Sequence, residues 1–141
     1  MESGSEPLVD VRERLLDLHK ALVDAERRDY ERARGRLPDR DFLDALLRDP
    51  ALAWLGALTA LIVRLDQLLE EAEPHPDPAD PIAEIRKLLR PDAGGSEFQR
   101  KYADALQRSP DAVLAHGRTM HTLQAQATST GVPPVRRSNS G

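Results

Sequence analysis

A long, nearly uncharged segment near the middle of the chain, residues 49–66, constrains the fold most strongly. Asp49 is a good N-cap, and Pro50 stands at the first helical position, where its missing N–H removes no hydrogen bond. The segment therefore predicts a helix with a well-marked start. Residues 51–63 carry no charge, but this run is shorter than the roughly 20 residues needed to cross a bilayer. We expect a core helix of a soluble protein and no membrane partner.

Helical phase divides this central helix into two halves. At about 100° per residue, one apolar face runs along its whole length. That face consists of Trp54, Leu58, Leu61, Leu65, Leu68 and Ala72. In the first half the opposite side carries small residues that allow a second helix to approach closely: Ala53, Gly56, Ala57 and Ala60. In the second half that side becomes polar, so we expect complete burial early in the helix and one-sided burial later.

Composition supports a helical core. Only 4% of the 141 residues are aromatic while 40% are hydrophobic, so Leu, Ala, Val and Ile must build the core, which favours helices over sheet. The net charge of −4 is spread over interspersed acids and bases, which predicts no nucleic-acid partner. The absence of cysteine excludes disulfides and thiolate chemistry. Residues 1–6 do not resemble a signal peptide, so a cytoplasmic location is expected.

Further helices are indicated on both sides of the central one. A stripe of apolar residues at steps of three and four predicts a first helix over 7–34. The stripe consists of Leu8, Val11, Leu15, Leu18, Leu22 and Ala25. Gly35 is the expected C-cap of this helix, and a short helix follows over 39–48. Beyond a proline-rich connector at 74–81, Asp80, Ser96 and Ser109 are expected to cap three more helices.

The last of these helices has an expected inward stripe of Val113, His116, Met120, Leu123 and Ala127. Together the elements predict an all-α fold, an antiparallel helical bundle of four principal helices plus short helices. Residues 1–127 form one domain in this interpretation. Residues 128–141 lose all periodicity and are expected to be a disordered tail.

Histidines are the natural candidates for metal or proton chemistry near neutral pH. His116 and His121 are five residues apart on one helix, so they cannot face a single metal ion. His19 lies at the edge of the first helix's stripe, and a ligand site shared with His116 is conceivable where the two helices are neighbours. The alternative is that each ring is a hydrogen-bonded core residue. We predict no metal and no cofactor.

A second candidate is a polar pocket between the first and central helices. Asp29 projects onto the middle of the first helix's apolar face, flanked by Glu26 and Tyr30, and Arg64 lies at the border of the central helix's small-residue side. We expect Asp29 or Glu26 to contact Arg64 in such a pocket, with His19 nearby. The alternative is that Asp29 lies beyond the edge of the core.

The runs at residues 18–31 and 49–55 resemble a family of small uncharacterised bacterial all-helical proteins, and this resemblance implies a bacterial origin and a helical fold but no activity. No catalytic motif is visible in the sequence, which does not favour an enzyme. The leading hypothesis is a protein-binding or assembly module that acts through a helical surface, with a protein partner or a second copy of itself. The alternative is a cofactor-, metal- or small-ligand-binding bundle, catalytic or not, that uses the polar pocket.

Overall fold

The computed structural model describes the backbone of residues 6–70 and 79–129 and the side chains of 8–70 and 81–126. All regular elements in these ranges are helices, which confirms the all-α class. They are α1 (Glu6–Arg34), α2 (Asp39–Arg48), the 3₁₀ helix η1 (Pro50–Leu55), α3 (Gly56–Glu70), α4 (Ala79–Leu88), α5 (Glu97–Arg108) and α6 (Pro110–Ser129). Most of the predicted connector, with His75, lies outside the described residues, as do positions 130–141 of the predicted tail. Residues 128 and 129, predicted as tail, belong to α6.

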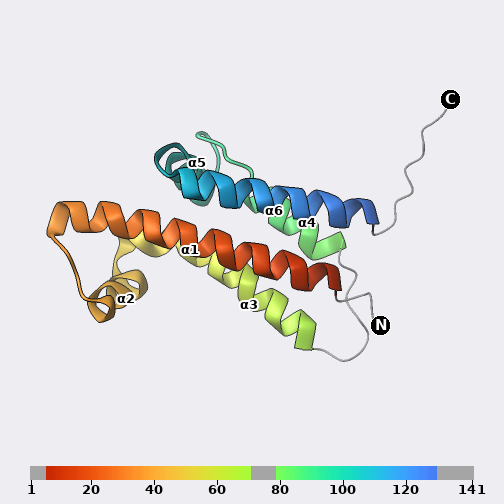
Figure 1. Ribbon diagram of the computed structural model, residues 1–141, viewed down its shortest axis with the longest axis horizontal. Coiled ribbons are helices and arrows are strands. Elements are labelled where there is room, and N and C mark those ends of the chain that lie inside the picture. The colour runs from red at the N-terminus through yellow and green to blue at the C-terminus, as the bar shows by residue number, and fades with distance from the viewer. Residues whose placement is uncertain (1–5, 71–78, 130–141) are drawn as a thin grey trace.

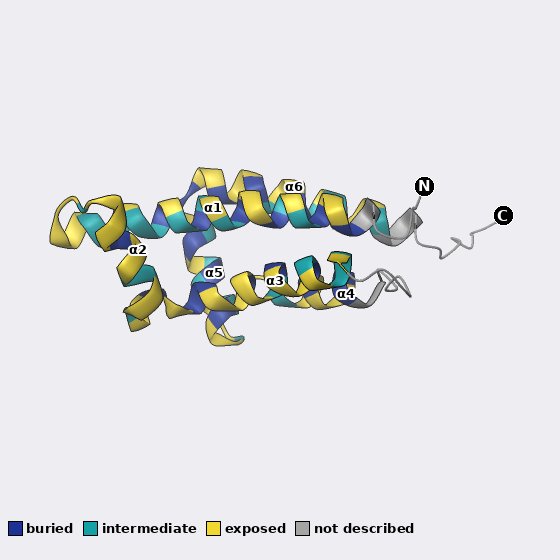
Figure 2. Ribbon diagram, turned by 90° about the horizontal axis from the view of Figure 1, so that it is seen from below, coloured by how far each residue is buried: buried dark blue, intermediate teal, exposed yellow. Residues whose placement is uncertain are grey.

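Helices α1, α6, α3 and α4 form an antiparallel bundle of two layers (Figure 1 and Figure 2). Helices α1 and α6 lie side by side and run in opposite directions (Figure 1). Helices α3 and α4 make the second layer, and α5 lies between the layers at one end (Figure 2). Helix α1 packs against α6, α3 and α5. It is therefore the central element of the fold.

The predicted stripe on α1 is the centre of the core. Its six residues are all buried, with exposures of 0–3%. The helix ends as expected, because Gly35 adopts a positive φ of 88° and its N–H donates to the carbonyl of Glu31 at 2.7 Å. A positive φ is unstrained only for glycine. Beyond this cap the chain turns into α2, where Phe42 is buried while Leu43 and Leu47 are exposed.

The central helix differs from its prediction in two ways. Asp49 caps it through a hydrogen bond from the Ala51 N–H, but the first six residues form 3₁₀ turns before the α-helix begins at Gly56. Its early part is not buried all round, since the small-residue side is exposed at Ala53, Gly56, Ala57 and Ala60. A Cβ added at Gly56 would meet nothing within 4 Å. The expectation of complete early burial is therefore wrong, because no described helix packs on that side.

The main apolar face of the central helix is confirmed in part. Trp54, Leu58 and Leu65 are buried, while Leu61 and Leu68 are half-buried. Leu55 and Ile62, which were not assigned to this face, are also buried. The buried face is thus rotated relative to the prediction, and Ala72 lies outside the described residues.

The inward face of α6 also differs from the predicted stripe. Its buried residues are Ala112, Ala115, Thr119 and Leu123, while His116 and Met120 stand at the border. Val113, predicted to be inward, is 48% exposed. Most of the buried residues are small because α6 lies close beside α1; Leu123 is the large buried residue, while Val113 and Leu114 are turned outward. The side chain of Ala127 lies outside the described residues.

Helix caps in the C-terminal half follow the sequence closely. Ser96 and Gln99 form a reciprocal capping box at the start of α5, and Ser109 Oγ accepts a hydrogen bond from the Ala112 N–H at 3.1 Å. Helix α4 begins at Ala79, one residue before its predicted Asp80 cap. From α5, Phe98 stacks on Tyr102 and packs on Trp54, with ring centroids 5.4 Å apart in both pairs. These aromatic rings close the end of the core.

The continuous helical stretch Pro50–Glu70 is long and apolar enough to cross a membrane by length and composition alone. This stretch exceeds the uncharged run that the sequence analysis considered, because it includes the polar half of α3. Core helices of soluble proteins meet the same criterion. Here its inner face is buried against α1.

Candidate functional site

The predicted pocket residues do not converge. Arg64 pairs with Glu84 of α4 at 3.0 Å, so the expected contact with Asp29 or Glu26 is wrong. Both side chains of the Arg64–Glu84 pair are about half exposed. Arg64 therefore lies on the outside of the seam between α3 and α4, away from the carboxylates of α1.

Arg108 of α5 takes the place expected of Arg64. Its guanidinium donates to Glu26 at 3.0 Å and also binds the carboxylate of Asp29. Asp104, one turn earlier on α5, accepts a third bond at 3.0 Å. Glu26 is the most enclosed member, with 15% of its side chain exposed. One carboxylate is thus substantially buried beside an arginine, but the arginine is Arg108 and not the expected Arg64. The arrangement joins α5 to α1, and each of its charged groups already has a partner.

Tyr30 lies in a different place again. Its hydroxyl donates to Asp49 at 2.6 Å, so Asp49 caps η1 with one oxygen and binds α1 with the other. The bond from Tyr30 lowers the pKa of Asp49, with help from the Ala51 N–H, and raises the pKa of Tyr30. The guanidinium of Arg34 lies over the tyrosine ring, with its carbon 3.9 Å from the ring centroid. This cluster fixes the end of α1 on the start of the central helix.

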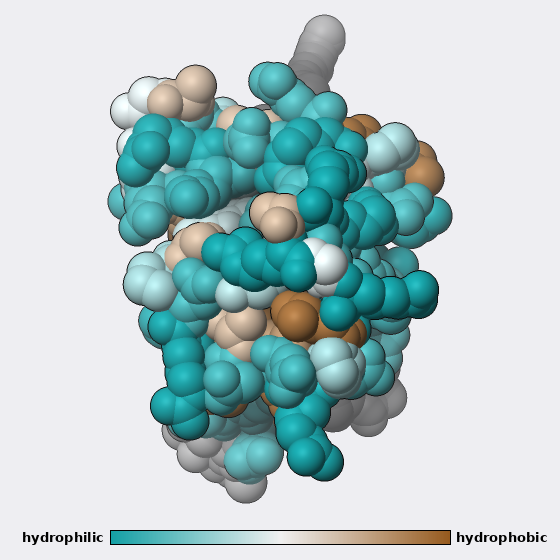
Figure 3. Space-filling view, turned by 90° about the vertical axis from the view of Figure 1, so that its left-hand side faces the viewer, coloured by the Kyte–Doolittle hydropathy of each residue, from teal (hydrophilic) through white to brown (hydrophobic). Residues whose placement is uncertain are grey.

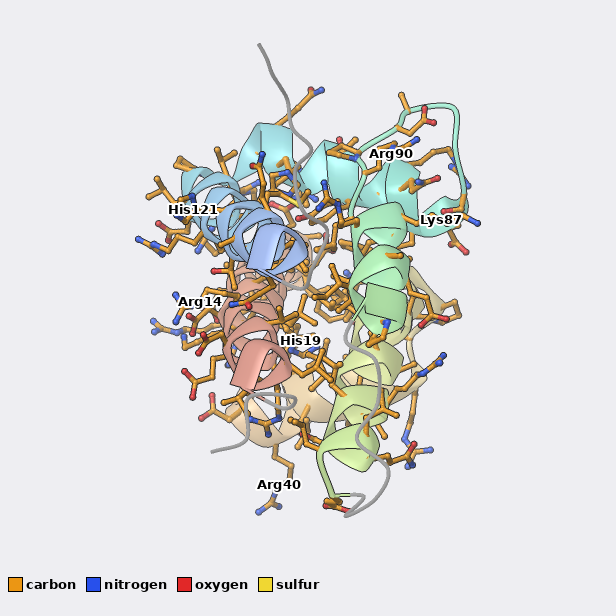
Figure 4. The ribbon with its side chains drawn as sticks, turned by 90° about the vertical axis from the view of Figure 1, so that its right-hand side faces the viewer. Arg14, His19, Arg40, Lys87, Arg90 and His121 are labelled. Carbon is orange, nitrogen blue, oxygen red and sulfur yellow. The ribbon has the colours of Figure 1, made fainter. Side chains whose placement is uncertain are left out.

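The two histidines form hydrogen bonds across two different helix–helix interfaces of the bundle. His19 Nε2 lies 3.2 Å from Thr59 Oγ1 and joins α1 to α3; Figure 4 shows it on the side of α1 that faces α3. His116 Nδ1 lies 2.5 Å from the hydroxyl of the fully buried Tyr102 and joins α6 to α5. Burial lowers the pKa of both histidines and raises that of Tyr102.

Each predicted site residue therefore belongs to a polar contact between two elements. No group of three or more His, Asp or Glu side chains able to hold a metal occurs in the described parts of the chain. The hydrogen-bonded alternative for His19 and His116 agrees with the geometry. Sequence reasoning missed Tyr102 and Thr59, the partners of these histidines, and Arg108. No local sequence pattern points to these three residues. Only the packing of α3, α5 and α6 brings Thr59 to His19, Tyr102 to His116 and Arg108 to Glu26.

A different feature stands out on the outer side of the α1–α6 pair. There a hollow of about 490 Å³ opens to solvent. It is lined by Arg14, Val113, Leu114, Gly117, Arg118, His121 and Thr122. Leu114 is 57% exposed, and a Cβ added at Gly117 would meet nothing within 4 Å. In Figure 4, Arg14 and His121 lie on this side, away from α3 and α4.

Two further hollows continue the first along the same seam. One, of about 380 Å³, shares Leu114 and Arg118 with it and extends towards the start of α6. The other, of about 350 Å³, shares Arg14, His121 and Thr122 and extends towards the end of α6. We call the three together the α1/α6 groove. It spans Asp111 to Gln126 on α6, which corresponds to about 22 Å at the rise of an α-helix.

The end of the molecule that carries α2 offers a second hollow for comparison. This end is mainly hydrophilic, with hydrophobic side chains near the middle of the view and others at its upper right edge (Figure 3). A hollow of about 480 Å³ between α1 and α2 is lined largely by charged residues, including Asp41, Asp44 and Arg48. The α1/α6 groove is therefore the stronger candidate for a binding surface.

No protein-family model, curated protein or solved structure matches this chain.

Proposed function

We propose that this protein is a helix-binding module, which holds an amphipathic helix of a partner protein in the α1/α6 groove. The observation that carries the proposal is the exposure of Val113 and Leu114 in a hollow that continues along the whole seam. Two antiparallel helices leave a furrow into which the side-chain ridge of a third helix packs. Recognition of this kind places apolar residues of the partner at steps of three and four.

Small residues support close approach of the partner. Gly117, Ala21, Ala115 and Ala125 line the groove along its length. With only short side chains at these places, the backbone of a third helix can approach α1 and α6 while its larger apolar side chains contact Leu114. The length of the groove matches a partner helix of about 15 residues, or four turns.

The test uses a fluorescein-labelled helical peptide of about 15 residues, with a leucine stripe on one face and glutamine elsewhere. We expect its fluorescence anisotropy to rise on titration with the full chain. The double substitution Val113→Asp and Leu114→Asp should weaken binding at least about tenfold, because it places two charges where apolar contact forms. Leu47→Asp is the matched control, since Leu47 is 76% exposed on α2 and lines none of these hollows.

An unchanged affinity in the double variant would overturn the proposal, as would a wild-type chain that does not bind the peptide. Circular dichroism of each variant shows that the bundle is still folded. An equal loss in the Leu47→Asp control would place the contact on α2 instead.

A further inference from the structure

The charges along the α1/α6 groove are ordered, and they point to the charge pattern of the partner. At the centre of the groove, Arg14 and Arg118 flank the apolar hollow together with His121, and no carboxylate lines that hollow. Arg14 forms an ion pair with Asp17 of the next turn, with 3.5 Å between Nη1 and Oδ2. Arg118 has no ion pair with any described residue. The centre is therefore a basic zone in a chain whose net charge is −4.

Both ends of the groove are acidic. Asp10 and Glu13 line the end beside the last turns of α6. The charged residues that line the end beside the start of α6 are Asp17, Asp24, Asp111 and Lys20, together with Arg118, which this end shares with the central hollow. Lys20 is bonded to Asp24 at 3.0 Å, and Asp17 is the partner of Arg14 at 3.5 Å. Asp111 is therefore the acidic group of that end that has no ion pair with a described residue. The order along the seam is thus acidic, basic, acidic.

We propose that the partner helix carries acidic side chains at its centre and basic side chains towards both ends, on either side of its apolar stripe. This inference rests on the proposed function and specifies its partner. Charges at the rim of a groove add little affinity singly, but they set the register and reject sequences with the opposite order. An ordered pattern also distinguishes this partner from a uniformly anionic surface, which would be repelled by the two acidic ends.

Two peptides of identical composition test the order of charges. Both are helical, of about 15 residues, with the same leucine stripe. One has glutamates at the centre and lysines at both ends, and the other has these positions exchanged. Because their net charges are equal, any difference in affinity reports the charge order, once circular dichroism has shown equal helicity. We expect the acidic-centre peptide to bind at least about fivefold more tightly, and the difference to vanish in about 0.5 M NaCl.

Charge reversal in the protein provides the second arm. Arg118→Glu should abolish or invert the preference between the two peptides. Arg40→Glu is the matched control, because Arg40 is an exposed arginine of α2 that points away from the groove (Figure 4). We expect this control to keep the wild-type preference.

The outcomes separate this inference from the function on which it rests. If the leucine–glutamine peptide binds but the two charged peptides bind equally, the charge order is overturned and helix binding stands. If none of the three peptides binds, both proposals fail. Binding of the full chain to vesicles of anionic phospholipid with loss on Arg118→Glu would assign the groove to a membrane. A concentration-dependent dimer that Arg118→Glu dissociates would assign it to a second copy of the chain.

Discussion

At the scale of single residues, Trp54 combines a buried aromatic ring with a buried N–H group that is unpaired within the described part of the chain. Its ring is 5% exposed and packs on Phe98, yet its indole N–H has no hydrogen-bond partner among the described residues. A buried donor without an acceptor lowers stability by about 1–3 kcal/mol relative to a paired one. The large apolar area of the ring offsets this penalty.

Substitutions at Trp54 should reflect both effects. We expect Trp54→Ala to lower the free energy of unfolding by about 3–5 kcal/mol, because it removes a large buried ring and leaves a cavity. Trp54→Phe should cost much less, since it keeps an aromatic ring and removes the unpaired N–H. Denaturant unfolding followed by circular dichroism measures both. An unchanged stability in Trp54→Ala, or a water-like fluorescence of native Trp54, would contradict this packing.

The two half-buried histidines should make the stability depend on pH. Burial lowers the pKa of His19 and His116 below the ordinary value of 6.5. The unfolded chain therefore binds more protons than the native chain in the window just below pH 6.5. This contribution to stability is complete above that pH and is lost as the pH falls through the window.

We therefore expect a lower free energy of unfolding at about pH 5.5 than at about pH 7.5. His19→Gln and His116→Gln should each reduce this difference. Denaturant titrations at the two pH values provide the measurement. A pH dependence that is unchanged in both variants would show that other groups cause it.

At the scale of helices, each seam of the bundle combines apolar packing with one or a few polar contacts. His19 with Thr59 joins α1 to α3, and Tyr102 with His116 joins α5 to α6. The buried hydroxyl of Thr119 donates within α6 to the Ala115 carbonyl at 2.8 Å and also lies 3.4 Å from the Arg14 carbonyl of α1. Such contacts favour one register of neighbouring helices over others, because a shift by one turn would leave the polar groups unpaired.

The most enclosed ion-pair cluster should matter more than the exposed one. We expect Arg108→Ala to lower the free energy of unfolding by about 1–2 kcal/mol, because it leaves the largely enclosed Glu26 without its partner and leaves Asp29 with Arg32 alone. Arg64→Ala is the matched control and should cost under about 0.5 kcal/mol, since its pair with Glu84 is about half exposed. Thermal unfolding of the two variants compares them. Equal losses would show that burial of Glu26 contributes nothing.

At the scale of the whole molecule, α1 organises the fold and α6 covers it. Helices α6, α3 and α5 all pack on α1, and the last fully buried side chain of α6 in the described part is Leu123. In the described part of the chain, the last turns of α6 therefore add no fully buried side chain to the core. Beyond it, residues 130–141 contain no periodic apolar positions.

A chain that ends at Ser129 should accordingly fold as the full chain does. We expect the same helical circular dichroism signal and an unchanged melting temperature, because no buried position of the described core is removed. As a control, a chain that ends at Met120 should lose stability, since it lacks Leu123. A clearly lower melting temperature of the chain that ends at Ser129, compared with the full chain, would show that residues 130–141 pack on the bundle.

The sequence by itself determined where most helices begin and end, and which face of α1 is buried. Asp49, Ser96 and Gly35 act through hydrogen bonds and backbone angles within a few residues, so their roles follow from local chemistry. The stripe on α1 is flanked by charged residues, so only one face can enter the core.

Tertiary structure decided which faces of α3 and α6 are buried, and therefore where the groove lies. Both helices have apolar residues on several sides, so periodicity allows more than one orientation and packing against α1 selects among them. Val113 became exposed for this reason. The partners of charged residues were also undetermined, because a long arginine side chain can reach several carboxylates. Only the position of α5 brought Arg108, and not Arg64, to Glu26 and Asp29.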